Sequence, residues 1–367
     1  QTEPTHFKAV IRKYSFAFLA GIFLGCCCLS SAAQTLPATV PLKDFSRNDF
    51  FDEASISPDG AYLALRVPIG DQRGLVIVDI ATHKIISKFS VGKDRDFDEY
   101  WWASSKRLVF GLAASYGSLE APRPTGELVA FDIDGNDPVY LYGCCGNYSY
   151  TESHISHGGH DKGFAKVLRT LPDDPEHVLI VIDDWEGNKD EHRSYVCRMD
   201  THTARCDHTV ISPIIGWRSA FAADSNGFVR YAVGRDENLK LVTYTRTPAH
   251  PDWQVLNSGE LSNAEITPLG FSYDNSQVYL SSSGNGDRRC LVRQDLASGQ
   301  RTSLSCDDIT DLDGVIWSFD DNEPVAAIYQ SGRPELRLLD TQNPARGTIQ
   351  ALQAAFPRQV AIPVSHS

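Results

Sequence analysis

The 367-residue sequence predicts an all-β fold, a β-propeller of about six four-stranded blades. A unit of short apolar strands separated by polar turns recurs six times, and such a repeat every ~40–50 residues is typical of a propeller. Five of the six units carry an Asp at the end of their third strand. Amphipathic helical periodicity is nearly absent. We therefore expect one propeller over residues 46–357, interrupted by an insertion at residues 143–162.

The first half of each unit is a strand, a tight turn and a second strand. Its clearest copy is Ser55–Leu65, in which Ser57-Pro-Asp-Gly60 predicts the turn. The same position is filled by Trp101–Phe110, Leu171–Ile182, Phe221–Tyr231, Phe271–Leu280 and Trp317–Ala327. The predicted blades then cover residues 46–92, 93–142, 163–212, 213–260, 261–308 and 309–355.

The third strand of each unit is the easiest to align. The six copies are Gly74–Asp79, Glu127–Asp132, Tyr195–Asp200, Leu239–Tyr244, Cys290–Asp295 and Glu335–Asp340. An Asp at the end of such a strand can accept backbone N–H bonds within a hairpin turn. We interpret the closing Asp residues as turn formers, and not as acids or ligands. Five tryptophans are expected to pack between blades: Trp101, Trp102, Trp185, Trp217 and Trp317.

The two ends of the chain differ from the repeat. Residues 1–33 have the basic, apolar and small-residue regions of a secretory signal peptide, and the apolar run Phe16–Leu29 is too short for a good membrane span. Residues 34–45 are a lead-in, and residues 358–367 are interpreted as the start of an incomplete further blade. We expect a periplasmic or secreted protein that is a fragment of a longer one.

The composition excludes one class of partner. The formal net charge is −13, and an acidic surface repels phosphate backbones, so we expect no binding of nucleic acid. No motif for a cofactor is found, and no cofactor is expected. Apart from the signal peptide, no segment is apolar enough to span a bilayer.

Six cysteines follow the predicted signal peptide, and an even number in an oxidising compartment predicts disulfides. Cys197 and Cys206 flank one predicted hairpin turn, and Cys290 and Cys306 flank another. Antiparallel pairing about each turn places the two cysteines roughly opposite one another, which favours these two disulfides. For Cys144-Cys145 a vicinal disulfide, partners elsewhere and free thiols all remain open.

One histidine cluster in the insertion could bind a metal ion. His154, His157 and His160 have a spacing of three residues, so that three imidazoles could meet a Zn²⁺ ion. Gly158-Gly159 breaks helical order between them, and a flexible loop is a poor preorganised site. A solvated loop is therefore the preferred interpretation, and the metal site is the weaker one.

An ordered set of motifs resembles the N-terminal half of a known enzyme family. The set comprises Pro41–Asn48, Ser57–Gly60, Asp94–Asp96, Arg107–Phe110 and Leu171–Val178. It is similar to bacterial S9 peptidases, the prolyl oligopeptidase family, of the secreted dipeptidyl- or acylaminoacyl-peptidase type. The resemblance covers nearly all of residues 40–367. It implies a propeller that precedes an α/β-hydrolase domain, which carries a Ser-His-Asp triad.

The catalytic part of that family is missing from this sequence. No Gly-x-Ser-x-Gly occurs, and the nearest string, Gly270–Asp274, lacks the second glycine and lies in a predicted strand. We assign no catalytic residue. The resemblance implies a non-catalytic propeller that gates access of short peptides to a C-terminal hydrolase domain in a secreted serine peptidase, and the chain alone is expected to be inactive.

Two other functions remain open at this stage. The first is a stand-alone periplasmic propeller that acts as a protein-interaction module, as TolB-like propellers do. The second is a propeller glycosidase, which would need acids that converge at the central channel. Paired carboxylates are present, but each pair lies at a predicted strand end or turn: Asp173-Asp174, Asp183-Asp184, Asp307-Asp308 and Asp320-Asp321.

Overall fold

A computed structural model describes most of the propeller region. The residues it describes are 41, 50–70, 72–92, 95–115, 120–143, 156–157, 162–185, 192–214, 218–258, 261–262, 264–284, 286–319, 322–357 and 359–365. Residues 49–367 form one compact unit, and the fold below is that of this unit. The predicted signal peptide, nearly all of the lead-in, and Cys144-Cys145 lie outside the described residues.

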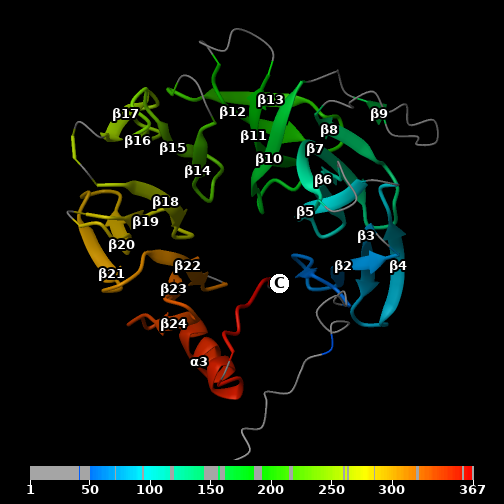
Figure 1. Ribbon diagram of the computed structural model, residues 1–367. Coiled ribbons are helices and arrows are strands. Elements are labelled where there is room, and N and C mark those ends of the chain that lie inside the picture. The colour runs from blue at the N-terminus through cyan, green and yellow to red at the C-terminus, as the bar shows by residue number, and fades with distance from the viewer. Residues whose placement is uncertain are drawn as a thin grey trace, which may run out of the picture. The chain divides into compact units, whose positions relative to one another are not determined.

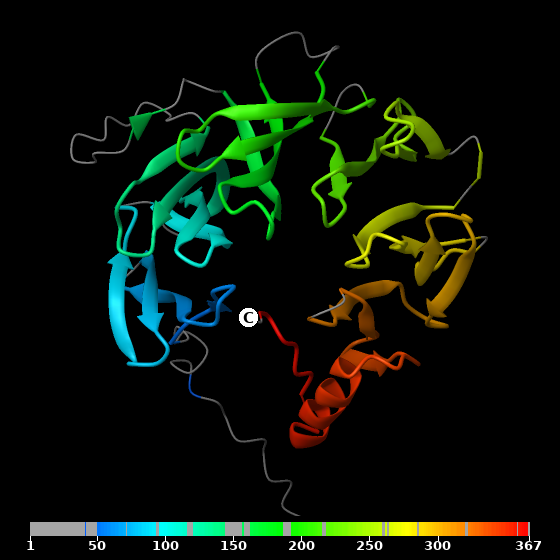
Figure 2. The same ribbon diagram turned by 180° about the vertical axis from the view of Figure 1, so that it is seen from behind.

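Six sheets follow one another around a ring (Figures 1 and 2), which confirms the predicted propeller; all strand pairs are antiparallel except β8 with β9. We number them as blades 1 to 6. Blade 1 contains β1 (Glu53–Ile56), β2 (Tyr62–Ile69), β3 (Gln72–Asp79) and β4 (Lys84–Phe89). Blade 2 contains β5 (Arg95–Ser104), β6 (Arg107–Ala114), β7 (Arg123–Asp132), β8 (Val139–Tyr142) and β9 (Ser156–His157). Blade 3 contains β10 (Gly163–Thr170), β11 (His177–Asp184), β12 (Tyr195–Asp200) and β13 (Cys206–Ile211).

The other three blades continue the ring. Blade 4 contains β14 (Ala220–Ala223), β15 (Val229–Arg235), β16 (Leu241–Thr245) and β17 (Gln254–Asn257). Blade 5 contains β18 (Ile266–Phe271), β19 (Gln277–Ser282), β20 (Cys290–Asp295) and β21 (Arg301–Ser305). Blade 6 contains β22 (Leu312–Trp317), β23 (Pro324–Gln330) and β24 (Pro334–Leu338), followed by α3 (Ala345–Ala355).

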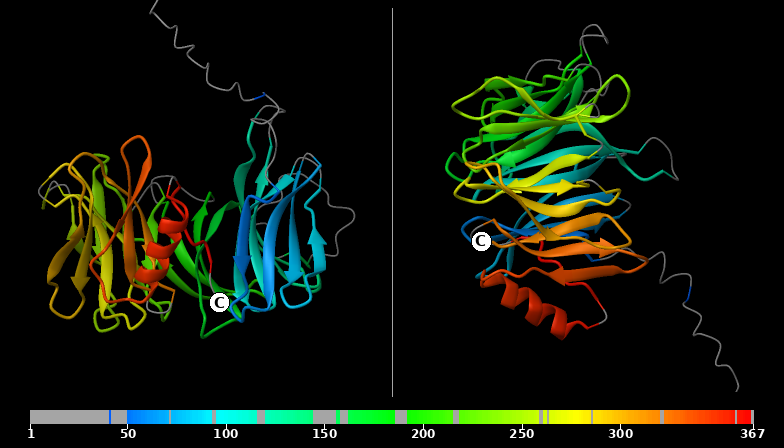
Figure 3. Two further views of the ribbon diagram at one scale, coloured as in Figure 1. Left: turned by 90° about the horizontal axis from the view of Figure 1, so that it is seen from below. Right: turned by 90° about the vertical axis from the view of Figure 1, so that its left-hand side faces the viewer.

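Each sheet keeps its strands in chain order, with the first strand nearest the middle of the ring (Figure 1). The strands run up and down between the two ends of the ring (Figure 3). Where the first strand of each blade ends, the chain makes the turns between strands one and two and between strands three and four. We call this the turn end. The opposite end, the loop end, carries the connections between strands two and three and between successive blades.

The tight turns follow from a repeated Ser and Asp. In blade 1 the Ser57 hydroxyl donates to Asp59 (2.6 Å) and accepts the Tyr62 N–H (2.9 Å). In blade 5, Ser272 makes the same two bonds with Asp274 and the Gln277 N–H. Because these short side chains satisfy the turn's own backbone, the chain reverses without leaving polar groups unpaired.

Three closing Asp residues form turns as predicted. Asp79 accepts the Thr82 N–H, Asp200 accepts two backbone N–H groups, and Asp295 accepts those of Ala297 and Ser298. Asp132 differs, since its carboxylate accepts a hydrogen bond from the Arg107 guanidinium instead. The prediction for Asp132 was incomplete because the buried Arg107 provides a stronger partner than a turn N–H.

The core lies between successive blades, so a central strand is buried on both faces. In β6, Val109 packs into a cluster shared with blade 3, whereas Leu108 and Phe110 pack into one shared with blade 1. Burying each such side chain contributes roughly 1.5–3 kcal/mol. Trp102 is buried and Trp101 and Trp317 are half-buried, as predicted. The prediction was wrong for Trp185, which is exposed, and Trp217 lies outside the described residues.

Two blades depart from four strands. In blade 2, β9 adds a short strand that pairs in parallel with β8, so part of the insertion joins the sheet. In blade 6 the expected fourth strand is replaced by α3. Ile349 of α3 packs against the sheet. The helical choice follows from Pro344 at its start and the helix-favouring alanines behind it.

The segment after α3 returns toward blade 1. The backbone N–H of Ile56 donates to Ser365 Oγ at 3.1 Å. Residues 359–365 have no strand pairing, so the further blade that the sequence suggests stays a prediction. None of the helices among the described residues has the length and apolarity needed to cross a bilayer.

Both favoured disulfides are present. They join Cys197 to Cys206 and Cys290 to Cys306, with Cα–Cα distances of 5.7 and 4.6 Å. The register places Thr209, and not Cys206, opposite Cys197, so the first disulfide is diagonal across its hairpin. The two cysteines are thus only roughly opposite one another, as expected, because Cys206 pairs with Met199 and a bulge between Arg198 and Met199 shifts the register further.

Candidate functional site

The predicted histidine metal site falls mostly outside the described residues. His154 and His160 lie outside the described residues, and of His157 only the backbone in β9 is described. Among the described residues, no group of three or more His, Cys, Asp or Glu side chains has the arrangement of a metal site. The candidate site therefore comes from residues that the sequence analysis did not select.

A bulge on the innermost strand of blade 2 presents two carboxylates side by side. Phe97 pairs with Leu112 and Tyr100 pairs with Phe110, so that Asp98 and Glu99 share the space opposite Gly111. Phe97 and Tyr100 are buried on either side and fix this register. Bulges of this kind redirect side chains and are common beside functional sites.

A third carboxylate joins the pair from blade 1. The Arg66 guanidinium donates to the Asp98 carbonyl and lies 3.2 Å from the Glu53 carboxylate. We call Glu53, Asp98 and Glu99 the inner acidic site. Arg66 also donates to Asp52 at 2.7 Å, so its single positive charge is shared among several acids.

The electrostatics of the site disfavour negative charge. Burial raises the pKa of Glu53, and the nearby carboxylates add to this against the opposing effect of Arg66. Burial and the charge of Glu99 likewise raise the pKa of Asp98, in spite of Arg66 and Lys166. Because like charges held close together are unfavourable, a cation placed among them would be bound favourably.

A cavity of about 120 Å³ lies beside Asp98 and Glu99, between the inner strands of blades 2 and 3. Lys166 of β10 crosses its edge, with its ammonium 3.6 Å from Glu99. Two aromatic rings contribute to the wall. The lining residues are Asp98, Glu99, Trp101, Gly111, Leu112, Pro124, Gly126, Glu127, Leu128, Phe164, Ala165 and Lys166. Carboxylates next to aromatic rings suit an ammonium or guanidinium group.

Glu127 at the back of the cavity has a structural role. Its side chain is 3% exposed and forms an ion pair with Arg95, and it accepts hydrogen bonds from Tyr140 and Thr125. The preceding Gly126 has a φ of 79°, and a Cβ there would come within 2.6 Å of the Phe164 backbone. A fully bonded acid and a close blade contact make this wall rigid.

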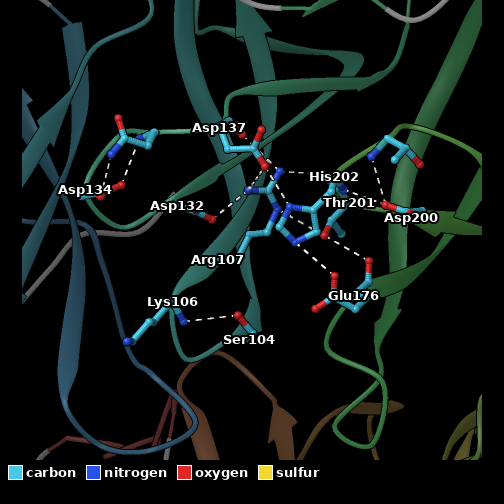
Figure 4. Close-up of polar contacts among 12 residues, drawn as sticks. Ser104, Lys106, Arg107, Asp132, Asp134, Asp137, Glu176, Asp200, Thr201 and His202 are labelled. Atoms are coloured by element: carbon cyan, nitrogen blue, oxygen red, sulfur yellow. Dashed lines mark hydrogen bonds and ion pairs between the residues drawn. The ribbon is translucent and has the colours of Figure 1, made fainter.

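A second polar cluster ties blades 2 and 3 together at the turn end (Figure 4). Arg107 is 2% exposed, and it donates to Asp132 at 2.8 Å and to both the hydroxyl and the carbonyl of Thr201. His202 lies between Asp137 (2.8 Å) and Glu176 (3.3 Å). A depression of about 380 Å³ lies next to this cluster. Since every donor of Arg107 that faces blade 3 is bonded, we assign the cluster a role in holding the blades together.

Two sequence signals could have revealed these sites. Asp98-Glu99 interrupts the apolar pattern between Phe97 and Tyr100, where a regular strand would place at most one of them outward. Arg107 and Glu127 each begin an otherwise apolar run, which predicts a charge buried with a partner. Neither signal specifies the partner, because that depends on contacts between strands.

Comparison with solved structures supports the fold. Prolyl oligopeptidase B from Galerina marginata matches with a TM-score of 0.50 and 11% identity, over 80% of this chain and 44% of that one. A prolyl endopeptidase matches with a TM-score of 0.50 and 12% identity, over 79% and 41%. TolB from Acinetobacter baumannii matches with a TM-score of 0.40 and 13% identity, over 84% and 73%, and at this TM-score the match carries no argument about the fold. No protein-family model matches the chain. No curated protein sequence matches it either.

These matches extend over only part of the peptidases. The chain spans about two-fifths of the length of the solved prolyl oligopeptidases that it resembles. At identities of 11 to 12%, the likeness establishes a propeller of the same type and no more.

Proposed function

We propose that this chain is the non-catalytic propeller of a secreted serine peptidase that acts on short peptides. The motifs that resemble S9 peptidases support the proposal. So does the likeness in fold to the propeller part of prolyl oligopeptidases. In this account, catalysis belongs to an α/β-hydrolase domain on the same polypeptide, C-terminal to the propeller. The propeller restricts access to that domain and binds one end of the substrate.

The observation that carries a substrate-binding role is the inner acidic site. A peptide with a free N-terminus presents an ammonium group that can pair with Asp98 and Glu99, while its first side chain contacts Trp101 or Phe164. Such charge-assisted bonds are about twice as strong as neutral ones. Arg66 and Lys166 oppose the rise in the pKa of Asp98 that burial and the charge of Glu99 cause. The propeller would thereby orient the peptide for cleavage elsewhere.

The test is a chemical search for a catalytic serine in the full protein that the gene encodes in its source. An antibody raised against this chain isolates that product from its source, and a fluorophosphonate probe then labels any activated serine. We expect a labelled polypeptide longer than 367 residues, with labelling blocked by prior treatment with phenylmethanesulfonyl fluoride. An unlabelled product no longer than this chain would reject the peptidase and favour the stand-alone interaction propeller.

A further inference from the structure

Arg169 of β10 is a half-buried cation with no bonding partner. Its Nε is buried and makes no hydrogen bond. One other such atom occurs among the described residues, the Nε of Arg289, but the terminal nitrogens of Arg289 pair with Glu265 and Asp311. Arg169 has no hydrogen bond or ion pair in the described part of the chain. Its guanidinium is therefore a positive charge that the fold itself leaves uncompensated.

The one acid that acts on Arg169 is already bonded elsewhere. Burial lowers the pKa of Arg169, and the charge of Asp224 opposes this shift. The Asp224 carboxylate accepts hydrogen bonds from Arg230 at 3.0 Å and from the backbone N–H groups of Asn226 and Phe228. A charge taken partly out of water without a partner lowers stability. An arginine in this state suits an anion that comes from outside the fold, and a carboxylate matches its planar donors.

Arg169 lies on the same strand as the lysine that borders the inner acidic site. β10 is the strand of blade 3 nearest the middle of the ring (Figure 1). Lys166 of β10 pairs with Glu99 at 3.6 Å, and Arg169 follows three residues later, near the turn end. Three strand residues span about 10 Å. A carboxylate bound at Arg169 would thus be on the order of 10 Å from an ammonium bound at Asp98 and Glu99.

We propose that Arg169 binds the terminal carboxylate of a short peptide. This inference rests on the proposed function for the other end of the peptide, whose ammonium is held at the inner acidic site. The ends of an extended tetrapeptide are also about 10 Å apart, since each residue advances the chain by roughly 3.4 Å. The net charge of −13 disfavours anions near the protein in general, so attraction of a carboxylate depends on a local cation. A tetrapeptide with both ends free would then bridge the two sites.

Four peptides test the two ends separately. Isothermal titration of the 367-residue chain, at low ionic strength, compares tetraalanine, its C-terminal amide, its N-acetylated form and the form blocked at both ends. We expect tetraalanine to bind about tenfold more tightly than its amide, a gain typical of a hydrogen bond between charged groups. The form blocked at both ends should not bind.

A matched pair of variants assigns this gain to one residue. Arg169→Met keeps a long side chain and removes the charge, so it should abolish the advantage of tetraalanine over its amide and leave binding of the amide unchanged. The exposed Arg293→Met on β20 is the control and should leave the advantage intact. Arg169→Met should also raise the melting temperature, because it removes an unpaired charge. A fall in the melting temperature would show a structural role for Arg169 and overturn the inference.

The outcomes separate this inference from the proposed function. Loss of the advantage in Arg169→Met, but not in Arg293→Met, supports the carboxylate site. Equal affinity of tetraalanine and its amide, or an advantage that survives in Arg169→Met, overturns it, even if the amide still binds at the inner acidic site. Binding of the N-acetylated acid but not of the amide keeps the carboxylate site and rejects the ammonium site. Acetate that competes as strongly as N-acetyltetraalanine would assign Arg169 to small free carboxylates and overturn its role in binding a peptide end.

Discussion

The turn end and the inner acidic site both contain carboxylate side chains, but the two environments shift the carboxylate pKa in opposite directions. At the turn end, backbone and side-chain bonds from Ser298 lower the pKa of Asp295 to about 2, and bonds from Thr82 lower the pKa of Asp79. At the inner acidic site, burial raises the pKa of Glu53 and Asp98. The two turn acids are thus stabilised as anions, whereas the anionic forms of Glu53 and Asp98 are disfavoured. The surroundings of a carboxylate, rather than the number of carboxylates, decide the direction of the shift.

The largest expected effect is at the blade junction of the turn end. Arg107→Ala should lower the free energy of unfolding by about 3–4 kcal/mol, because it leaves the Thr201 carbonyl and other acceptors without a buried partner. Urea denaturation measures this change. The neighbouring exposed Lys106→Ala is the control and should change stability by less than about 0.5 kcal/mol. Equal effects of the two variants would contradict a junction role for Arg107.

The corresponding buried pair near the loop end should matter somewhat less. Glu127→Gln keeps the shape of the side chain, but it replaces one of the two accepting oxygens with a donor and removes the charge that pairs with Arg95. We expect a loss of about 2 kcal/mol in the same denaturation experiment. The exposed Glu120→Gln is the matched control. No loss in Glu127→Gln would show that the carboxylate charge is not needed there.

At the inner acidic site we expect a substitution to raise the stability instead of lowering it. Asp98→Asn removes one of three crowded negative charges, so the melting temperature at pH 7 should rise by about 1–2 °C. Because the folded pKa of Asp98 lies above its unfolded value, the native state binds this proton more readily, and the gain should shrink as the pH falls from 7 toward 4. Calorimetry across that range checks the prediction, and a constant gain would contradict it.

The smallest expected effect is at an exposed turn, and it disappears as the pH falls. Asp295 has a folded pKa below its unfolded value, so the stability that it contributes is present above about pH 4 and is lost as the pH falls toward 2. Asp295→Asn should therefore lower stability at neutral pH and remove part of the decline between pH 4 and pH 2. Melting curves of the variant and wild type should converge at pH 2. Parallel curves would mean that the charge of Asp295 does not stabilise its turn.

The sequence predicted those parts of the fold that depend on local chemistry. Ser57-Pro-Asp-Gly60 and the closing Asp residues act within a few residues of the chain, and the strands and turns around them could be predicted. The bulge at Asp98 and Glu99 could not, because it depends on the register between β5 and β6. The pairing of Arg107 with Thr201 joins residues 94 positions apart, and local patterns do not contain that information.

Blade 6 shows where the repeat itself misleads. The sequence unit predicts a fourth strand after Asp340, but residues 345–355 form α3 and pack on the sheet face. A helix and a strand can each cover the apolar face of the last sheet. A short apolar run therefore does not decide whether this segment is a helix or a strand. The choice is made by Pro344 and by the alanines of the segment.

The central claim is that the inner acidic site binds the ammonium group of a peptide. The most direct measurement is isothermal titration of the 367-residue chain with tetraalanine amide and with its N-acetylated form, at low ionic strength. The account predicts that only the free amine binds, and that Asp98→Asn with Glu99→Gln weakens binding at least about tenfold, a loss of ~1.4 kcal/mol, while Asp134→Asn at the turn end does not. Binding of both peptides with equal affinity, or of neither by the folded protein, would contradict it.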